Sequence, residues 1–284
     1  MIKQQLPNIV TSLNLLCGVL GILTLTFQYT PGLPIPPNSL AVYLMFAAAF
    51  FDFVDGFVAR ALKVDSPLGK QLDSLADVVT FGVLPGMLMF IGIGSLLTVN
   101  GNAILFYLTE LSLRGQVTVS GIAIGESQPE ISLGKMALQA LPFLIPALLV
   151  PILSAFRLAK FNIDTRQSHS FIGLPTPANG LFLASVYFAI QQGYVGNIHP
   201  AILSVLTLIF AILLVSPLPL FAMKFKGFAW KGNEVRFIFL ALLVVTVTLA
   251  AILGKVMAAV PILVILYILI SIINNIATRK NNEV

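Results

Sequence analysis

Charged side chains are scarce in this sequence, where Asp, Glu, Lys and Arg together make up 10% of 284 residues. Soluble domains carry about 25% charged residues, so this composition excludes an ordinary soluble globular protein. Hydrophobic residues reach 58% instead, and they are gathered in long runs. The chain is therefore expected to be an integral membrane protein.

Cysteine and histidine are almost absent as well. The one cysteine, Cys17, excludes an internal disulfide and any metal site built from several thiolates. Its neighbourhood lacks the small residue that lipoprotein processing needs, so Cys17 is interpreted as a packing residue. The two histidines, His169 and His199, fall in different predicted loops on opposite sides of the membrane. They are therefore interpreted as loop residues and not as metal ligands.

Long apolar runs account for most of the sequence. A hydrocarbon core of about 30 Å requires roughly 20 apolar residues per helix. The runs predict an all-α integral membrane protein of about eight transmembrane helices, at residues 9–28, 39–62, 73–97, 136–158, 176–195, 199–222, 236–254 and 257–277. No internal repeat or low-complexity tract divides them, so residues 1–284 are expected to form a single membrane domain.

Basic residues are distributed unevenly between the two sides of these predicted helices. Of the 16 lysines and arginines, all but Arg114, Lys135 and Lys255 fall on the side of the N-terminus. The positive-inside rule then predicts that both termini are cytoplasmic, in the inner membrane of a prokaryote. The net charge of +5 is spread over loops, so no nucleic-acid partner is expected. The insertion at about 98–135 is expected on the outer side and is assigned no chemistry.

Four aspartates interrupt the predicted membrane helices of this acid-poor chain. It has 11 acidic residues, and four of them lie close together: Asp52, Asp55, Asp73 and Asp77. A carboxylate in the bilayer costs roughly 2.5–3.5 kcal/mol on insertion scales, so it is retained for a function. Helical spacing places each pair on one face. The two helices form a predicted hairpin at about 39–97, so both acidic faces can meet at the cytoplasmic surface.

Carboxylates held together in a low dielectric repel one another. Hard divalent cations with oxygen ligands remove that repulsion, so we expect Mg²⁺ or Mn²⁺, in a two-metal site of the kind used for phosphoryl chemistry. Small residues between the acids, Gly56 and Ala59, would leave a cleft for a phosphate or nucleotide. Two other interpretations stay open. The acids could be solvated or ion-paired to Arg60, Lys63 and Lys70, and the small residues could only pack helices.

The whole pattern resembles the signature of the CDP-alcohol phosphatidyltransferase family. Eight positions match it in residue and spacing: Asp52, Asp55, Gly56, Ala59, Arg60, Gly69, Asp73 and Asp77. The resemblance implies a metal-dependent transfer of a phosphatidyl group from CDP-diacylglycerol to an alcohol, with release of CMP. It also implies a homodimer.

The resemblance further implies a role for each matched residue. Asp52, Asp55 and Asp73 would be metal ligands, while Asp77 would contact metal and act as the catalytic base. The remaining matched residues would lie against the CDP moiety and its phosphates: Gly56, Ala59, Arg60 and Gly69.

Three further segments resemble bacterial phosphatidylserine synthases within that family. The first is 6–14, in which Asn8 and Thr11 are plausible nucleotide contacts. The second is 77–85, and the third is the link formed by 157–162 and 171–180. Lys160 departs from the pattern, because many relatives are expected to have Arg there, and Lys lacks the bidentate fork.

The third segment also makes chemical sense for an amino-acid acceptor. Arg157 and Lys160 end a predicted helix on the cytoplasmic side and could hold a carboxylate or phosphate. Asn162 or Asp164 could receive an ammonium group. Positive-inside anchoring is the alternative for both basic residues.

The resemblance therefore implies transfer of a phosphatidyl group from CDP-diacylglycerol to L-serine, giving phosphatidylserine and CMP. An alternative within the family is glycerol-3-phosphate or an inositol phosphate as acceptor, for which Arg157, Lys160 and Arg166 would supply positive charge. A different class, an ion-coupled transporter, also uses intramembrane acids. Clustering of the acids at one membrane face, without an inverted repeat, argues against it.

Overall fold

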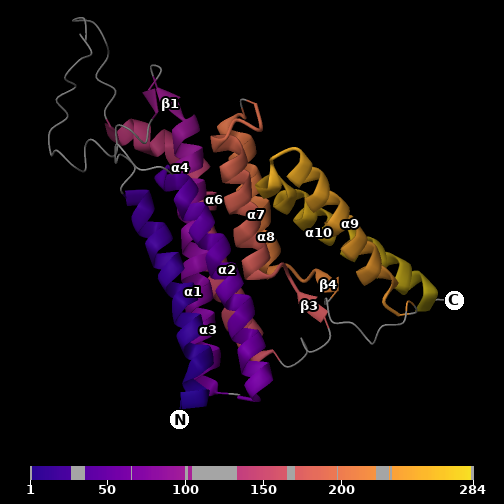
Figure 1. Cartoon of the computed structure of the whole chain (residues 1–284). Coiled ribbons are helices and arrows are strands. Elements are labelled where there is room, and N and C mark those ends of the chain that lie inside the picture. The colour runs from indigo at the N-terminus through magenta and orange to yellow at the C-terminus, as the bar shows by residue number, and fades with distance from the viewer. Residues whose placement is uncertain are drawn as a thin grey trace, which may run out of the picture.

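The fold is a bundle of long helices (Figure 1). The computed structural model describes residues 2–26, 36–64, 66–99, 102–103, 133–164, 170–196, 198–221, 230 and 232–282. Its helices are α1 (Ile2–Thr26), α2 (Pro37–Leu62), α3 (Pro67–Asp77), α4 (Leu84–Leu96), α6 (Leu133–Ile163), α7 (Thr176–Gln191), α8 (Pro200–Val215), α9 (Glu234–Ile252) and α10 (Ala259–Asn282). All eight apolar runs are therefore largely helical.

Two short two-stranded antiparallel sheets and two short helical segments complete the described part of the chain. β1 (Thr98–Val99) pairs with β2 (Asn102–Ala103), and β3 (Ser170–Ile172) pairs with β4 (Pro219–Phe221). The π-helix η1 (Val78–Val83) joins α3 to α4, and the 3₁₀ turn η3 (Val256–Ala258) precedes α10. Apart from β1, β2 and the start of α6, the insertion at 98–135 lies outside the described residues.

Six helices in the described part of the chain are long and apolar enough to cross a membrane. They are Gln5–Leu25, Asn38–Leu62, Pro67–Leu96, Leu138–Ile163, Glu234–Ile252 and Val256–Ala277. The remaining two, α7 and α8, have 16 residues each. A multi-pass membrane protein is thus supported, while a count of eight spans stays a prediction that requires α7 and α8 to cross as well.

The turn between α2 and α3 is shaped by its own residues. Lys63 ends α2 in the left-handed conformation, with φ 52° and ψ 42°. Ser66 then caps α3 by accepting a 3.0 Å hydrogen bond from the Gly69 N–H, and Pro67 occupies the first helical turn, where it needs no N–H partner. The turn lies at the same end of the bundle as the N-terminus (Figure 1). The predicted hairpin is therefore present, with a link shorter than expected.

The helix that leaves this turn passes through the core of the bundle. α3, η1 and α4 follow one another without a break from Pro67 to Leu96. Pro85 has no N–H for the carbonyl four residues earlier, and the wider π-turns that precede it are a common way to absorb such a defect. The side chains of Leu84, Leu88 and Ile93 are completely buried. This central helix fixes the position of its acidic N-terminal part.

The last two helices, α9 and α10, form a hairpin at the edge of the bundle (Figure 1). Tyr267 on α10 donates a 2.9 Å hydrogen bond to the Phe221 carbonyl of β4. Asn275 donates another, of 2.6 Å, to the Pro219 carbonyl. The hairpin is thus tied to β4, the strand that pairs with β3.

Candidate active site

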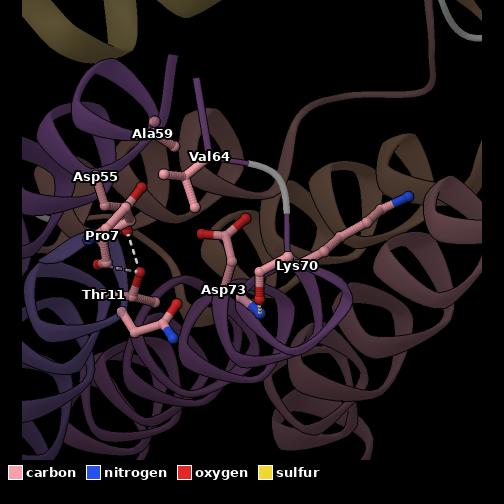
Figure 2. A pocket seen from close by; sticks show the side chains of 11 residues that line it. Pro7, Thr11, Asp55, Ala59, Val64, Lys70 and Asp73 are labelled. Atoms are coloured by element: carbon pink, nitrogen blue, oxygen red, sulfur yellow. Dashed lines mark hydrogen bonds between the residues drawn. The ribbon is translucent and has the colours of Figure 1, made fainter. Parts of the chain in front are cut away.

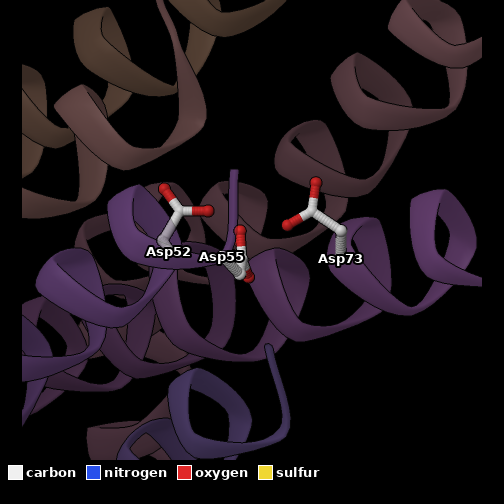
Figure 3. A group of neighbouring side chains, drawn as sticks. All are labelled: Asp52, Asp55 and Asp73. Atoms are coloured by element: carbon white, nitrogen blue, oxygen red, sulfur yellow. The ribbon is translucent and has the colours of Figure 1, made fainter. Parts of the chain in front are cut away.

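Three carboxylates from two helices converge near the α2–α3 turn. Asp52 and Asp55 lie on α2, Asp73 lies on α3, and each offers an oxygen within 4.8 Å of the others. The three side chains point into the same space (Figure 3). Asp55 is buried and the other two are partly buried. The two acidic faces predicted from helical spacing therefore do meet.

The donor set fits a hard divalent cation. Carboxylate oxygens are the ligands that Mg²⁺ and Mn²⁺ prefer. The Oδ1 atom of Asp73 is buried and has no hydrogen-bond partner among the described residues. An unpaired buried anion of this kind needs a positive partner to be stable. Asp52, Asp55 and Asp73 thus form a group that could bind a metal ion.

The ion-pair interpretation of these acids finds no support in the part of the chain that the structure describes. Lys70 extends away from Asp73 (Figure 2), and its ammonium group donates a 3.3 Å hydrogen bond to the Asn162 carbonyl. Arg60 and Lys63 are exposed. Among the described residues, the groups found to act on the three carboxylates include other aspartates but no lysine or arginine.

Helix α1 supports the acids from one side. The Thr11 hydroxyl lies 2.7 Å from Oδ2 of Asp55 and 3.1 Å from the Pro7 carbonyl. One turn further, the Asn14 amide donates a 3.4 Å hydrogen bond to Oδ1 of Asp77. Asn14 was not among the predicted site residues. The spacing Thr11-x-x-Asn14 on one face of an apolar helix was the available signal.

Asp77 lies near the three-carboxylate group but is not one of its members. It is buried, it ends α3, and η1 begins at the next residue. The group within 4.8 Å consists of the other three aspartates, and Asp77 interacts electrostatically with each of them. Asp77 interacts electrostatically with Arg157 on α6. π-helical segments are frequent at functional sites, and this one adjoins the residue expected to act as base.

A cavity of about 240 Å³ opens beside the carboxylates. Its lining contains two of the aspartates, Asp55 and Asp73, and five residues expected near CDP: Asn8, Thr11, Gly56, Ala59 and Gly69. Figure 2 shows side chains from α1, α2 and α3 around it. Arg60 is not part of the lining. Sequence reasoning missed four other lining residues, which are Pro7, Val64, Ser66 and Lys70.

The glycines of the signature differ in what surrounds them. A Cβ atom on Gly56 would meet only the far end of Arg60, at 3.9 Å, so protein packing does not require a glycine there. A Cβ on Gly69 would come within 2.9 Å of Oδ1 of Asn8. Gly69 therefore permits the close approach of α3 to α1, whereas Gly56 leaves free space toward the cavity. For Gly56, helix packing alone is not an explanation.

The residues expected near the acceptor differ in burial. Arg157 is buried, donates a 3.1 Å hydrogen bond to the Thr176 hydroxyl, and lies 5.4 Å from the centre of the Phe161 ring. Lys160 is exposed. Asn162 donates a 2.8 Å hydrogen bond to the Ser74 hydroxyl of α3, next to Asp73. The three residues thus lie on the α6 end that faces the acidic helix.

Three proteins whose sequences are similar to this chain share one name. A protein of Bacillus subtilis (strain 168), a CDP-diacylglycerol–serine O-phosphatidyltransferase, is 30% identical over 187 residues, 65% of this chain and 76% of the relative. A protein of the same name from Methanocaldococcus jannaschii is 26% identical over 211 residues, 74% and 71% of the two chains. A third, from Helicobacter pylori (strain J99), is 29% identical over 175 residues, 61% of this chain and about half (52%) of the relative.

The sequence profile of one family matches most of the chain. The match spans residues 4–216 and includes all four aspartates, the cavity and the link from α6 to α7. Helices α9 and α10 lie beyond it. The geometry of the site and the extent of this match lead to one assignment: the chain belongs to the CDP-alcohol phosphatidyltransferase family.

Proposed function

We propose that this protein transfers a phosphatidyl group from CDP-diacylglycerol to L-serine, giving phosphatidylserine and CMP. The observation that carries the proposal is the group of Asp52, Asp55 and Asp73 beside a cavity lined by the signature residues. Family membership and the names of the three relatives support the reaction and the acceptor. A cluster at one end of the bundle suits an enzyme that takes one substrate from the bilayer and another from water.

The metal requirement follows from the donor set. We assign Asp52, Asp55 and Asp73 as ligands of Mg²⁺ or Mn²⁺, with Asp77 at the edge of a site that could hold two ions. When bound, such ions stabilise the charge on the attacking and leaving oxygens of a phosphoryl transfer. The unpartnered Oδ1 of Asp73 supports this assignment. Thr11 would orient the Asp55 carboxylate through its hydroxyl.

The cavity would receive the CDP moiety. Asn8, Gly56, Ala59 and Gly69 line it, and the open space at Gly56 would let the diphosphate approach the backbone of α2. Arg60, exposed at the end of α2, would contact the nucleotide from outside the lining.

Asp77 would act as the base. The hydroxyl proton of serine would pass to its carboxylate while the hydroxyl oxygen attacks the lipid-side phosphorus. The bond from that phosphorus to the oxygen of CMP then breaks, and CMP leaves. Asn14 holds Asp77 by its amide hydrogen bond. The acceptor would be bound by three residues near the end of α6, which are Arg157, Lys160 and Asn162.

The placement in the membrane is also a proposal. Six apolar helices support a multi-pass membrane protein. We infer one membrane domain with both termini cytoplasmic and the site at the inner leaflet of a prokaryotic inner membrane, because basic residues gather on that side. We also infer a homodimer, on the family resemblance alone.

The reaction is tested with purified protein in detergent, CDP-diacylglycerol, labelled L-serine and Mn²⁺. We expect a labelled lipid that co-migrates with phosphatidylserine, and CMP in equal amount. Glycerol-3-phosphate and inositol phosphate, supplied in parallel, test the alternative acceptors. A protein that releases no CMP with any acceptor would not be this enzyme, and a transporter would behave in that way.

A further inference from the structure

Three buried polar side chains between α6 and α7 have unmatched hydrogen-bonding atoms. Asn179 is completely buried, and neither its Nδ2 nor its Oδ1 has a partner among the described residues. The Oγ of Ser154, also completely buried, and the Nε of Arg157 are unmatched as well. Native proteins leave few such groups, and each one asks for an explanation.

These side chains belong to helices that pack against the part of the central helix that follows Asp77. Ser154 precedes Arg157 by one turn of α6, and a Cβ on Gly82 of η1 would lie 3.0 Å from the Cβ of Ser154. Asn179 lies one turn after Thr176 on α7, beside Gly180, whose Cβ would lie 2.9 Å from the Phe81 carbonyl of η1. Ser154 and Asn179 thus belong to helices that both pack against η1, and each lies one turn from the Arg157–Thr176 contact; these four residues are called the polar region.

A hydrogen bond closes this region at its cytoplasmic end. The Arg157 guanidinium donates to the Thr176 hydroxyl at 3.1 Å, and it interacts electrostatically with Asp77. The unmatched Nε of the same guanidinium remains available as a donor. The region thus begins where Asp77 would meet the acceptor hydroxyl.

The unmatched atoms are complementary to the charged groups of an amino acid. One cation with a free N–H suits a single carboxylate. An amide oxygen suits an ammonium group, and the amide N–H₂ and a hydroxyl supply further donors and acceptors. Arg157 is the only buried lysine or arginine among the residues that the structure describes. A phosphate acceptor carries about two negative charges and would be poorly matched by one buried cation.

We propose that Asn179, together with Ser154 and Arg157, recognises the amino-acid part of the acceptor and selects it over a phosphorylated alcohol. The inference rests on the proposed function, because the selected acceptor is the serine of that reaction. Asn179 binds the ammonium and Arg157 the carboxylate, which leaves the serine hydroxyl directed at Asp77. Water in the same region would satisfy these groups without conferring selectivity, and this is the alternative that the experiment decides.

The experiment compares Asn179→Leu, which removes both polar atoms at similar volume, with Asn179→Asp, which keeps the shape but adds a negative charge. Ser185→Ala is the matched control, because the Ser185 hydroxyl is also buried and unmatched on α7 but lies more than one turn beyond Asn179. Full-length proteins are assayed for the KM of L-serine and the KM of CDP-diacylglycerol. The shift in melting temperature caused by L-serine is measured separately in detergent.

We expect both Asn179 variants to raise the KM of L-serine by about 10- to 100-fold, as lost hydrogen bonds to charged groups do. The KM of CDP-diacylglycerol should stay within about twofold, and the serine-induced melting shift should disappear. Ser185→Ala should behave as the wild type. If either variant folds and keeps the wild-type KM of serine, the proposal is overturned and water is the better occupant. A wild-type protein that does not use serine at all would overturn the proposed function first, and this inference with it.

Discussion

The Thr11 hydroxyl lies 2.7 Å from the Asp55 carboxylate, although 44 residues separate them in sequence. Thr11 was expected to contact the nucleotide, and it also lines the cavity. Its hydroxyl is nevertheless engaged with an acid of the three-carboxylate group. A residue that orients a metal-ligating carboxylate influences metal affinity without touching the metal. The first helix is therefore part of the acidic site and more than a wall of the cavity.

Replacing Thr11 by Val tests this relationship, because Val keeps the shape and removes the hydroxyl. We expect the Mn²⁺ concentration that gives half-maximal CMP release to rise by about 10- to 100-fold. Ser12→Ala is the control, since the Ser12 hydroxyl is exposed and donates only to the Asn8 carbonyl. An unchanged metal dependence in Thr11→Val, with a raised KM for CDP-diacylglycerol, would favour nucleotide contact instead.

Two glycine variants should separate stability from activity. Gly56→Ala meets no protein atom closer than 3.9 Å, so it should leave folding intact or stabilise α2 by about 0.5–1 kcal/mol. Its methyl group enters the cavity and should raise the KM for CDP-diacylglycerol. Gly180→Ala would place a Cβ 2.6 Å from Cε of Met45 and 2.9 Å from the Phe81 carbonyl. It should destabilise the protein by about 1–3 kcal/mol. Melting temperature and kinetics, measured together, check both expectations.

Metal removal should act on activity and on stability. Chelation with EDTA should abolish CMP release, and added Mg²⁺ or Mn²⁺ should restore it. Bound cations also relieve repulsion among Asp52, Asp55 and Asp73, so they should raise the melting temperature of the wild type. The same ions should raise it less in Asp73→Asn. Full activity after exhaustive chelation would exclude the metal proposal.

The base assignment predicts a particular loss in Asp77→Asn. Proton transfer by a positioned side chain contributes about 10²- to 10⁴-fold, so kcat should fall by that order. Asp77 lies outside the group of three carboxylates within 4.8 Å, so the metal-induced rise in melting temperature should largely persist. A variant that transfers to serine at the wild-type rate would refute the assignment. If the variant loses both activity and the metal-induced rise in melting temperature, the main role of Asp77 is that of a metal ligand.

The membrane orientation is open to a direct measurement. A Cys17→Ser background with a single new cysteine at Lys3 or at Ser120 can be labelled in intact cells with an impermeant thiol reagent. We expect the cysteine at position 120 to react in intact cells and the cysteine at position 3 to react only after the cells are opened. The reverse pattern would place the site on the outer face.

Local sequence rules predicted the elements and the acidic faces. Apolar runs located the helices, and the offsets of Asp52, Asp55 and Asp73 placed their side chains on facing surfaces, because helical periodicity is a short-range property. The start of α3 was placed too late, at 73, although the Ser66-Pro67 pair is a helix-start signal. The first turns of α3 contain polar residues, so the apolar run becomes continuous only later in the helix.

Long-range partnerships could not be obtained in the same way. Asn14 contacts Asp77 across 63 residues, and Arg157 contacts Thr176 through the packing of two helices. Such pairs depend on how helices cross, which spacing within one helix does not determine. The sequence also did not predict the π-helix η1 after Asp77. Pro85 indicates an interrupted hydrogen-bond pattern, but it does not determine whether the helix kinks or forms π-turns.

The brevity of α7 has a consequence for how a water-soluble acceptor arrives. Sixteen residues span about 24 Å, less than the roughly 30 Å thickness of the hydrocarbon layer. No residue from Thr176 to Ile190 is exposed, so neighbouring helices surround α7 and the missing length leaves a depression in the surface of the bundle. We expect the depression on the side of Thr176, where α7 begins. Bulk water would then reach the acceptor side of the active site through this depression. The acyl chains of CDP-diacylglycerol would stay at their normal depth in the bilayer.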